Sequence, residues 1–300
     1  MKILIIGFGS IGARHARVAN SLGWDLALVS KQVNLPYQTF SSISTALNEF
    51  SPQAVIIATE TTEHYRCICE LEKHAQGLKI LVEKPLFDTE INFQPIHNRF
   101  FVAYNLRFHP VYKKIKNEIK NEKVIYAHIT CGSFLPNWRS GRNYLESYSA
   151  SILRGGGVLN DLSHEIDCAI GWFESKQLKY GNCKNSETLK IETEDHCSMM
   201  LTNDSKANIF VHIDYLSRIP YRRGIIHCES KTIQYDFIAK SVHVSGNEPE
   251  QYECEDDHSY SEQLVALEKD PNLLCSFQEG IQIMSLISEI KKHSKSSTPQ

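Results

Sequence analysis

Three side chains stand in sequence contexts that suit proton transfer. Lys84 follows an apolar run and precedes a proline, whereas Asp161 and His164 follow three successive glycines. A histidine titrates near neutral pH and suits a general acid or base, and a lysine can polarise or protonate a substrate oxygen. Asp161 and His164 are three residues apart, so both side chains share one face of a predicted helix. We predict these three residues as catalytic; the alternative is that His164 and Asp161 pair only for stability.

The N-terminal segment predicts a nucleotide site. Lys2–Ile6 is typical of a buried parallel strand, and a helix is expected to begin near Ser10. Gly7 permits a tight turn, Gly9 lets the backbone approach a pyrophosphate, and Gly12 lets the helix pack closely on the strand. The first N–H groups of that helix would face the phosphates; the alternative is a glycine-rich turn without a ligand. The residues predicted to bind the cofactor here are Gly7, Phe8, Gly9, Ser10, Ile11 and Gly12.

The end of the second predicted strand, 24–30, bears on which nicotinamide cofactor is bound. An acidic residue about 20 residues beyond the glycines usually binds the ribose hydroxyls in such sites. Ser30 and Lys31 stand there instead. A hydroxyl and an ammonium group attract the 2′-phosphate that a carboxylate would repel, so we expect NADP in preference to NAD. The alternative is that Lys31 is only a solvated loop charge.

Further predicted strands at 54–59, 79–82 and 100–103 would add residues to the cofactor site. Parallel strands place their carboxyl ends at one edge of a sheet, and ligands bind along that edge. The residues expected there are Thr59, His64, Glu83, Lys84 and Asn105. For His64, a structural or helix-capping role is the alternative.

Length, charge and cysteine content narrow the class of protein. The 300 residues are enough for two domains, and a net charge of -3 does not indicate a nucleic-acid or membrane-surface partner. Apolar runs are far shorter than the roughly 20 residues of a membrane span, and we expect no signal segment before the first strand. The nine scattered cysteines are expected to be reduced thiols, and no spacing suggests a metal site. We therefore expect a cytoplasmic, metal-free protein.

Four motifs together resemble one family of oxidoreductases. They are Gly7-Phe-Gly-Ser-Ile-Gly12, Glu83-Lys84-Pro85, Tyr104-Asn105-Leu106-Arg107 and Gly155-Gly156-Gly157-Val-Leu-Asn-Asp161-Leu-Ser-His164-Glu-Ile-Asp167. In this order they are similar to the family of glucose–fructose oxidoreductase, inositol dehydrogenase and rhizopine-catabolism proteins. The family more often places its aspartate four residues before the histidine, whereas the spacing here is three.

The resemblance implies an α/β protein with two domains. Residues 1–106 would form a Rossmann dinucleotide-binding domain, and residues 107–300 a substrate-binding α/β domain with an open, mostly antiparallel sheet. In the family this sheet forms the subunit interface, which implies a homodimer or homotetramer. The lysine of the family's Glu-Lys-Pro motif is catalytic and its bond to proline is commonly cis, and both properties carry over to Lys84 and Pro85.

A polar, aromatic loop follows the first predicted strand of the second domain, 124–131. Its two arginines, Arg139 and Arg142, suit a carboxylate or phosphate on a sugar, because guanidinium groups fit such oxygens. The alternative is that they pair with Glu146 or with a partner subunit. The residues predicted to contact substrate are Lys84, Arg107, Trp138, Arg139, Tyr144, Asp161 and His164.

The rest of the second half predicts alternating strands and turns, followed by helices. One helix is expected to carry Asp161, His164 and Asp167. Strands are expected at 190–192, 197–201, 207–215, 224–228 and 232–237, and helices at 259–270 and 277–292.

The sequence therefore predicts an NAD(P)-dependent oxidoreductase that interconverts a hydroxyl and a ketone on a sugar, sugar acid or nucleotide sugar. His164 would be the general acid or base and Lys84 its electrophilic or relay partner, with Asp161 binding a neighbouring hydroxyl and orienting the histidine. One alternative is a nucleotide-sensing regulator, against which the intact proton-handling residues argue. Another is an imine or unsaturated-diol reductase on the same fold.

Overall fold

The computed structural model describes residues 1–139 and 141–296, which divide into two compact units. The first unit comprises Met1–Phe108 and Asp256–Ile281, and the second comprises His109–Glu255 and the chain from Gln282 onward. A single boundary at residue 106 therefore does not describe the chain, because the segment 256–281 packs with the N-terminal residues.

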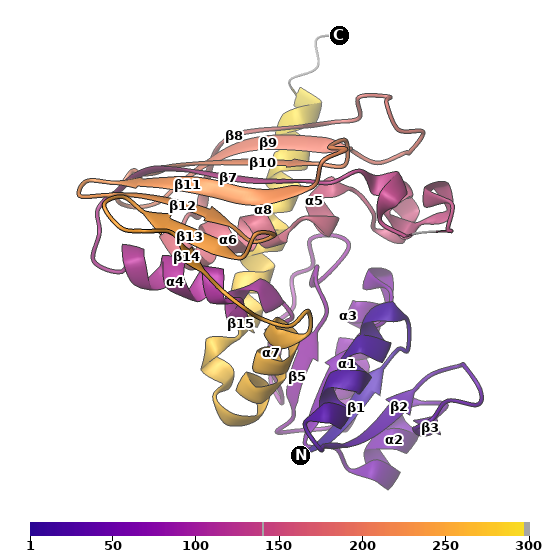
Figure 1. The fold of residues 1–300 in the computed structure, drawn as a ribbon. Coiled ribbons are helices and arrows are strands. Elements are labelled where there is room, and N and C mark those ends of the chain that lie inside the picture. The colour runs from indigo at the N-terminus through magenta and orange to yellow at the C-terminus, as the bar shows by residue number, and fades with distance from the viewer. Residues whose placement is uncertain (140, 297–300) are drawn as a thin grey trace. The chain divides into compact units, whose positions relative to one another are not determined.

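The first unit contains a seven-stranded sheet in the order β15-β6-β5-β4-β1-β2-β3 (Figure 1). Its strands are β1 (Lys2–Ile6), β2 (Asp25–Val29), β3 (Gln38–Phe40), β4 (Ala54–Ile57), β5 (Lys79–Val82), β6 (Arg99–Val102) and β15 (Cys275–Ser276). All neighbours pair in parallel except β15, which runs antiparallel to β6. The central strands β1 and β4 are buried on both faces, which is why they are continuous apolar runs.

The helices of this unit are α1 (Ser10–Ser21), α2 (Ile43–Phe50), α3 (His64–His74) and α7 (His258–Lys269). Helix α7 joins this unit through its apolar face, because Leu264 and Leu267 are fully buried with residues of β1 and β2. Ion pairs from Arg14 and Arg17 on α1 to Asp257 hold the start of α7. These contacts explain why residues 256–281 belong to the first unit.

The second unit contains an eight-stranded sheet in the order β14-β13-β12-β11-β7-β10-β9-β8. Its strands are β7 (Val124–Gly132), β8 (Gln177–Lys184), β9 (His196–Thr202), β10 (Asn208–Asp214), β11 (Tyr221–Cys228), β12 (Thr232–Asp236), β13 (Ser241–Val244) and β14 (Glu250–Gln251). Only β7 and β10 pair in parallel, so the expectation of a mostly antiparallel sheet is confirmed.

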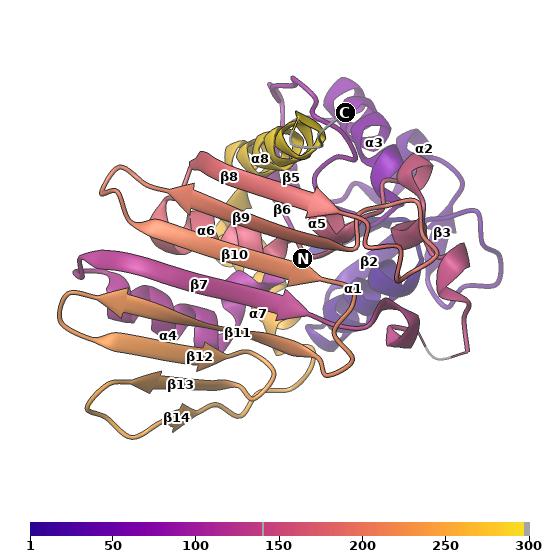
Figure 2. The same cartoon turned by 90° about the horizontal axis from the view of Figure 1, so that it is seen from above.

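Helices cover one face of this sheet. They are α4 (Pro110–Ile119), α5 (Val158–Asp161), α6 (His164–Phe173) and the last part of α8 (Phe277–Ser296). Figure 2 shows the opposite face, with α4 and α6 behind the sheet. That opposite face carries the half-exposed rings of Tyr180 and Phe210, the latter stacked on His128 at 4.9 Å.

Two expectations for the second half were wrong. No strand forms at 190–192, because the backbone there bonds to loops: the N–H of Glu192 donates to Ala150, and the Asn185 side chain donates to the carbonyls of Ile191 and Thr193. The single helix through Asp161 and His164 is interrupted. Leu162 leaves helical geometry and the Ser163 hydroxyl donates to the Asn160 carbonyl, so Asp161 ends α5 and His164 begins α6.

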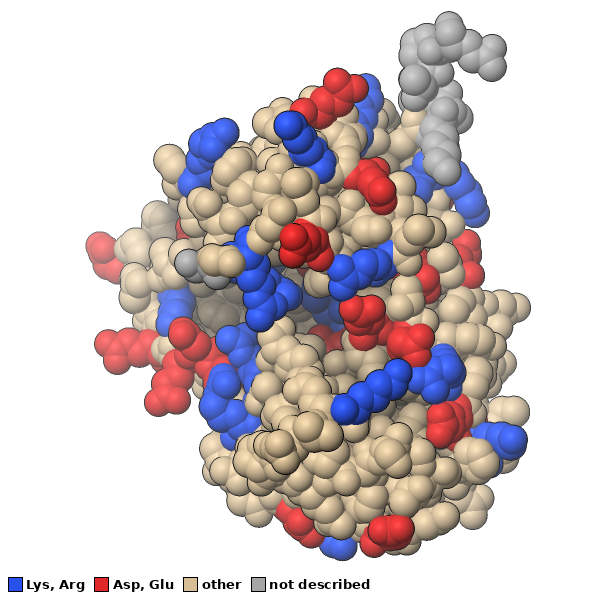
Figure 3. All heavy atoms as spheres, turned by 90° about the vertical axis from the view of Figure 1, so that its right-hand side faces the viewer, with Lys and Arg blue, Asp and Glu red and all other residues tan. Residues whose placement is uncertain are grey.

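The surface and the helices show two further properties. On the face drawn in Figure 3, Lys and Arg side chains lie among Asp and Glu side chains. Among the described helices, none combines the length and the apolar character that crossing a membrane requires.

Candidate active site

The glycine motif forms an open cradle at the start of α1. Gly7 has φ of +94° and lies so close to β4 that a Cβ there would be 2.6 Å from the Ala58 carbonyl oxygen. A Cβ on Gly12 would collide with the carbonyl of Gly7, whereas a Cβ on Gly9 would meet no atom within 4 Å. The first intrahelical bond runs from the N–H of Ala13 to the Gly9 carbonyl, so the three preceding amides are available to a ligand. The cradle therefore fits a phosphate group.

Ser30 and Lys31 lie at the end of β2, beside this cradle. The Ser30 hydroxyl accepts a hydrogen bond from the N–H of Gln32, and the Gln32 side chain donates to the Phe8 carbonyl at 2.9 Å. Ser30, Lys31, Tyr37 and neighbouring residues line a depression of about 440 Å³. None of the described residues that line it is acidic, so the depression suits an anionic group.

The exit of β5 fixes the backbone of Lys84. The peptide bond between Lys84 and Pro85 is cis, as the family resemblance predicted. Glu83 is buried and its Oε1 lies 2.7 Å from Nε2 of His15, a fully buried residue of α1. The Lys84 N–H donates to the second carboxylate oxygen of Glu83 at 3.3 Å. Glu83 therefore ties the strand exit to α1, and Lys84 is left partly exposed.

His64 lies at the start of α3 and is buried. Its ring nitrogens lie 3.2 Å from the Leu86 carbonyl and 3.3 Å from the Thr59 carbonyl. Burial lowers the pKa of His64, so its ring is neutral at neutral pH. These contacts join the chain after β4 to the chain after Pro85, which favours the structural alternative for His64.

Asn105 and Arg107 follow β6 in a short 3₁₀ helix, Asn105–Phe108. The Arg107 guanidinium lies 2.9 Å from the Glu279 carboxylate, and its side chain is only 8% exposed. Glu279 also accepts hydrogen bonds from the N–H and the hydroxyl of Ser276. This network holds the start of α8 and differs from the predicted contact between Arg107 and substrate.

The second unit places two tyrosines near Asp161. The Tyr215 hydroxyl donates to Oδ2 of Asp161 at 2.6 Å, and Tyr148 lies close enough to this carboxylate for it to raise the pKa of the Tyr148 phenol. Burial and the Asp161 carboxylate raise the pKa of both phenols, so both keep their protons. Sequence reasoning missed both residues, and the only available signal was the position of Tyr215 at the end of a predicted strand.

The glycines before α5 allow close backbone packing around Asp161. Gly157 has φ of +114°, and a Cβ on Gly156 would collide with the Tyr148 carbonyl. The Asn160 side chain donates to the Gly155 carbonyl at 2.9 Å. His164 is buried at the first position of α6, three residues beyond Asp161.

The predicted substrate loop encloses a pocket of about 550 Å³ within the second unit. Trp138, Arg139 and Tyr144, for which substrate contact stays a prediction, all line it together with Arg142, Tyr148 and Arg154. The Trp138 ring packs edge-on against Tyr215 at 5.2 Å between centroids, and its Nε1 donates to the Ser133 hydroxyl. Because Trp138 lines the pocket and packs against Tyr215, which bonds Asp161, the pocket adjoins that carboxylate.

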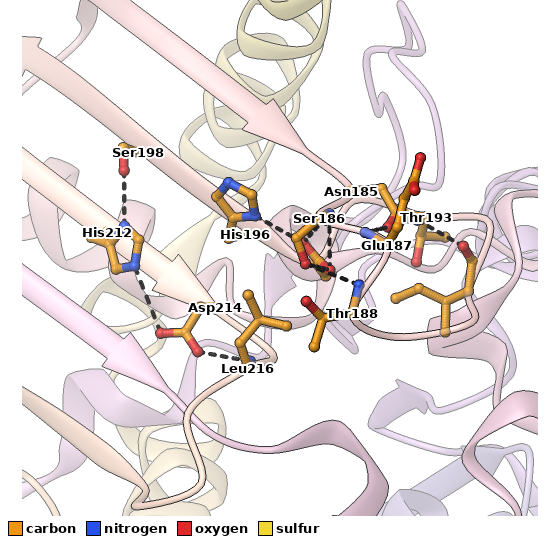
Figure 4. Close-up of polar contacts among 12 residues, drawn as sticks. Asn185, Ser186, Glu187, Thr188, Thr193, His196, Ser198, His212, Asp214 and Leu216 are labelled. Atoms are coloured by element: carbon orange, nitrogen blue, oxygen red, sulfur yellow. Dashed lines mark hydrogen bonds and ion pairs between the residues drawn. The ribbon is translucent and has the colours of Figure 1, made fainter.

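A second group of polar contacts lies at the ends of β9 and β10 (Figure 4). Asp195 accepts hydrogen bonds from the N–H and hydroxyl of Ser186 and contacts His196 at 2.8 Å. His212 bridges Ser198 and Asp214. These contacts order the loops between strands. Across the described ranges, no group of three or more His, Cys, Asp or Glu side chains could hold a metal ion.

The predicted residues therefore form two sets. Gly7, Ser30, Thr59, Lys84 and Asn105 follow β1, β2, β4, β5 and β6, so they lie along the carboxyl edge of the first sheet. Asp161 and His164 belong to the second unit with the arginine pocket.

Comparison with known proteins agrees with this architecture. Residues 1–94 match the model of an oxidoreductase family with an NAD-binding Rossmann fold. No curated protein matches the chain.

Solved structures resemble the chain over its whole length. Levoglucosan dehydrogenase in complex with NADH superposes with a TM-score of 0.83 at 16% identity, covering 100% of this chain and 99% of the other. UDP-N-acetylglucosamine 3-dehydrogenase GnnA from Acidithiobacillus ferrooxidans gives 0.80 at 15% identity, covering 99% and 98%. The WlbA dehydrogenase from Bordetella pertussis, in complex with NADH and UDP-GlcNAcA, gives 0.76 at 19% identity, covering 99% and 97%.

The whole chain thus has the fold of these dehydrogenases. Residues 1–94 match the oxidoreductase family with an NAD-binding Rossmann fold, which is the glucose–fructose oxidoreductase, inositol dehydrogenase and rhizopine-catabolism family that the motifs resemble.

Proposed function

We propose that this protein is an NAD(P)-dependent oxidoreductase that interconverts a hydroxyl and a ketone on a sugar, sugar acid or nucleotide sugar. The observation that carries the proposal is the glycine cradle, which leaves space at Gly9 against the N-terminus of α1. Backbone amides at a helix N-terminus bind phosphate, and the residues that form the cradle fall within the matched family region.

The cofactor is proposed to be NADP in preference to NAD. Gly7, Gly9 and the first turn of α1 would hold the pyrophosphate, and Ser30 and Lys31 would hold the 2′-phosphate. The non-acidic depression beside Ser30 supports this preference. The related levoglucosan dehydrogenase and WlbA structures contain NADH, so the preference is a property proposed for this chain alone.

The bound nicotinamide would accept or supply the hydride, and the chain's own residues would manage the proton. His164 is proposed to take the proton from the substrate hydroxyl during oxidation and to return it during reduction. Lys84 is proposed to polarise the same oxygen or to relay its proton. The N–H of Lys84 is bound by Glu83, and the peptide bond to Pro85 is cis. Asp161, held by the hydrogen bond from Tyr215, would bind a neighbouring hydroxyl and orient the histidine.

The arginine pocket supports an acidic or nucleotide-linked sugar. Arg139, Arg142 and Arg154 line this pocket together with Trp138 and Tyr144. Guanidinium groups bind carboxylate and phosphate oxygens, and the aromatic rings can pack against a sugar or base. GnnA is named for its action on UDP-N-acetylglucosamine, and WlbA was solved with UDP-GlcNAcA, which supports the same substrate class.

Two further properties complete the proposal. The protein is proposed to be a cytoplasmic homodimer or homotetramer that associates through the second sheet. The helix-free face of that sheet carries exposed aromatic side chains, including Tyr180 and Phe210, which supports burial against another copy. Sedimentation of the purified protein would measure the number of subunits.

The first experiment is a fluorescence titration of the wild type and Gly9→Ala with NADPH and NADH. The added methyl group meets no protein atom and Gly9 has an ordinary φ of −80°, so the variant should keep the wild-type melting temperature. We expect the wild type to bind NADPH and Gly9→Ala to bind it at least about tenfold more weakly, because the methyl group occupies the phosphate approach.

The second step is an assay of nicotinamide absorbance with UDP-N-acetylglucosamine, UDP-glucuronic acid and levoglucosan. Turnover that is lost in Lys84→Met and His164→Asn, with nucleotide binding retained, would support the proposal. Folded protein that binds neither nucleotide would refute it. Nucleotide binding without turnover of any sugar would favour the regulator.

A further inference from the structure

Two thiols of the second unit face each other across β8 and β9. Cys183 and Cys197 are direct register partners in this antiparallel pair. Cys197 is completely buried, whereas Cys183 is only partly buried. The two thiols lie close enough for each to shift the pKa of the other. Neither residue belongs to the proposed active site.

The backbone shows which kind of strand pair the two residues form. β8 is an edge strand, and the N–H of Cys183 donates to the Ser294 hydroxyl on α8 at 2.7 Å instead of to β9. Cys183 and Cys197 are therefore a non-hydrogen-bonded pair, in which Cα atoms lie about 4.5 Å apart and side chains are closest. Disulfides span Cα separations of about 4.4–6.8 Å, so the strand geometry suits a cross-strand bond.

The surroundings shift the pKa values of the two thiols in opposite directions. The interaction with Cys197 lowers the pKa of Cys183 to about 7; Ser294 and the Lys291 ammonium group also lower it, whereas burial and the Glu194 carboxylate, which pairs with Lys291, oppose them. The same contact and burial raise the pKa of Cys197. Cys183 is therefore the thiol that ionises more readily to the nucleophilic thiolate, while Cys197 keeps its proton.

Three other cysteines are buried and have raised pKa values. Burial raises the pKa of Cys67 to about 11, of Cys131 to about 12 and of Cys228 to about 11. All three are buried, so both access and ionisation protect them from oxidants. Cys183 combines partial exposure with a partner thiol in direct register.

We propose that Cys183 and Cys197 form a redox-active dithiol that closes to a disulfide when a hydroperoxide reaches the edge of the second sheet. The Cys183 thiolate attacks one peroxide oxygen, the O–O bond breaks, and the leaving oxygen takes a proton to become water. The Cys197 thiol then loses its proton and attacks the sulfenic sulfur, which releases a second water. The two thiols lose two electrons and two protons, and hydrogen peroxide is reduced to two waters.

The bond would join the edge strand β8 to β9 and close a short loop through residues 184–196. Cross-linking a loop of this size restricts the unfolded chain, so the oxidised form should be more resistant to unfolding. A dithiol reductant such as dithiothreitol would reverse the change by thiol–disulfide exchange.

The test treats the full-length reduced protein with a small excess of hydrogen peroxide and counts free thiols after denaturation. We expect the count to fall from nine to seven, with one cross-linked peptide pair containing Cys183 and Cys197 and lighter by two hydrogens. Dithiothreitol should restore nine thiols. The reaction should slow as the pH falls below about 7, where the Cys183 thiolate becomes protonated.

Three variants sharpen the test. Cys197→Ser should leave a sulfenic acid on Cys183 that dimedone traps, and Cys183→Ser should leave Cys197 unreacted. Cys228→Ser is the matched control and should form the disulfide like the wild type. Retention of all nine thiols in folded wild-type protein, or a disulfide between other cysteines, would overturn the proposal. Oxidation of Cys183 to a sulfinic acid without a disulfide would also overturn it.

Discussion

Tyr215 donates a 2.6 Å hydrogen bond to Asp161, and both side chains are buried. Tyr215→Phe removes this donor from a buried carboxylate. A hydrogen bond to a charged group contributes about 1.5–3 kcal/mol, so we expect a lower melting temperature. Turnover of any sugar that the wild type oxidises should fall about tenfold or more, because Asp161 loses its fixed orientation. Thermal unfolding and steady-state kinetics measure the two effects.

The matched control is Tyr221→Phe. Tyr221 donates an equally short hydrogen bond to Asp214, and neither residue was predicted to bind substrate or cofactor. It should lower stability and leave the turnover number unchanged. Equal losses of activity in both variants would show that Tyr215 acts only through stability.

The predicted preference for NADP over NAD depends on Ser30 and Lys31. Replacing both, as Ser30→Asp with Lys31→Ala, puts a carboxylate where the 2′-phosphate is expected and removes a positive charge. We expect the dissociation constant for NADPH to rise at least about tenfold and that for NADH to stay the same or fall. Nicotinamide fluorescence measures both constants. The control Lys73→Ala removes an exposed lysine from the end of α3.

A wild type that already prefers NADH would contradict this assignment. In that case Lys31 is the solvated loop charge that the sequence also allowed.

The first unit could be predicted closely from the sequence because its signals are local. Continuous apolar runs mark β1, β4 and β5, and the glycine spacing marks the turn into α1. The edge strand β8 was missed because its sequence, QLKYGNCK, has neither an apolar run nor strict alternation. Residues 256–281 join the first unit through contacts distant in sequence, which periodicity cannot reveal.

The candidate site was predictable where a motif is continuous and not where a contact is long-range. Trp138, Arg139 and Tyr144 share a loop, and they line one pocket. Tyr215 reaches Asp161 across 54 residues, and Arg107 meets Glu279 across a still longer separation. Residue types alone could not show that Glu83 would be bound to His15.

Asp214 predicts a dependence of stability on pH. Burial alone would raise the pKa of Asp214, but hydrogen bonds from His212, Tyr221 and the N–H groups of Leu216 and Ser217 hold it well below its usual value of 3.8. A depressed folded-state pKa stabilises the protein above the unfolded-state pKa, and this contribution is lost as the pH falls below about 4.

Asp214→Asn should therefore unfold more easily at pH about 7 and show a shallower loss of stability between pH about 4 and 2. Urea unfolding at a series of pH values measures this slope. Identical slopes for wild type and variant would contradict the role of Asp214.

The arginine pocket predicts recognition of an anionic substrate group. Arg139→Ala should weaken binding of UDP-glucuronic acid about tenfold or more, since a charge-assisted hydrogen bond is lost, and leave NADPH binding unchanged. Calorimetry measures the affinity, with Lys179→Ala on the exposed edge strand β8 as the charge-matched control. Unchanged affinity in Arg139→Ala, with wild-type binding established, would favour pairing of the arginine within the loop or with another subunit.

Substitution of Arg107 distinguishes a structural role of this residue from a role in substrate binding. Its side chain is 8% exposed and pairs with Glu279, which is 32% exposed. Breaking a fully buried pair costs about 3–5 kcal/mol, so Arg107→Met should cost somewhat less, on the order of 1–3 kcal/mol. Arg107→Met with Glu279→Met should be more stable than Arg107→Met alone, because no unpaired carboxylate then remains. Chemical unfolding of the three variants measures this coupling. Wild-type stability in Arg107→Met, together with weakened sugar binding, would instead indicate that Arg107 contacts the substrate.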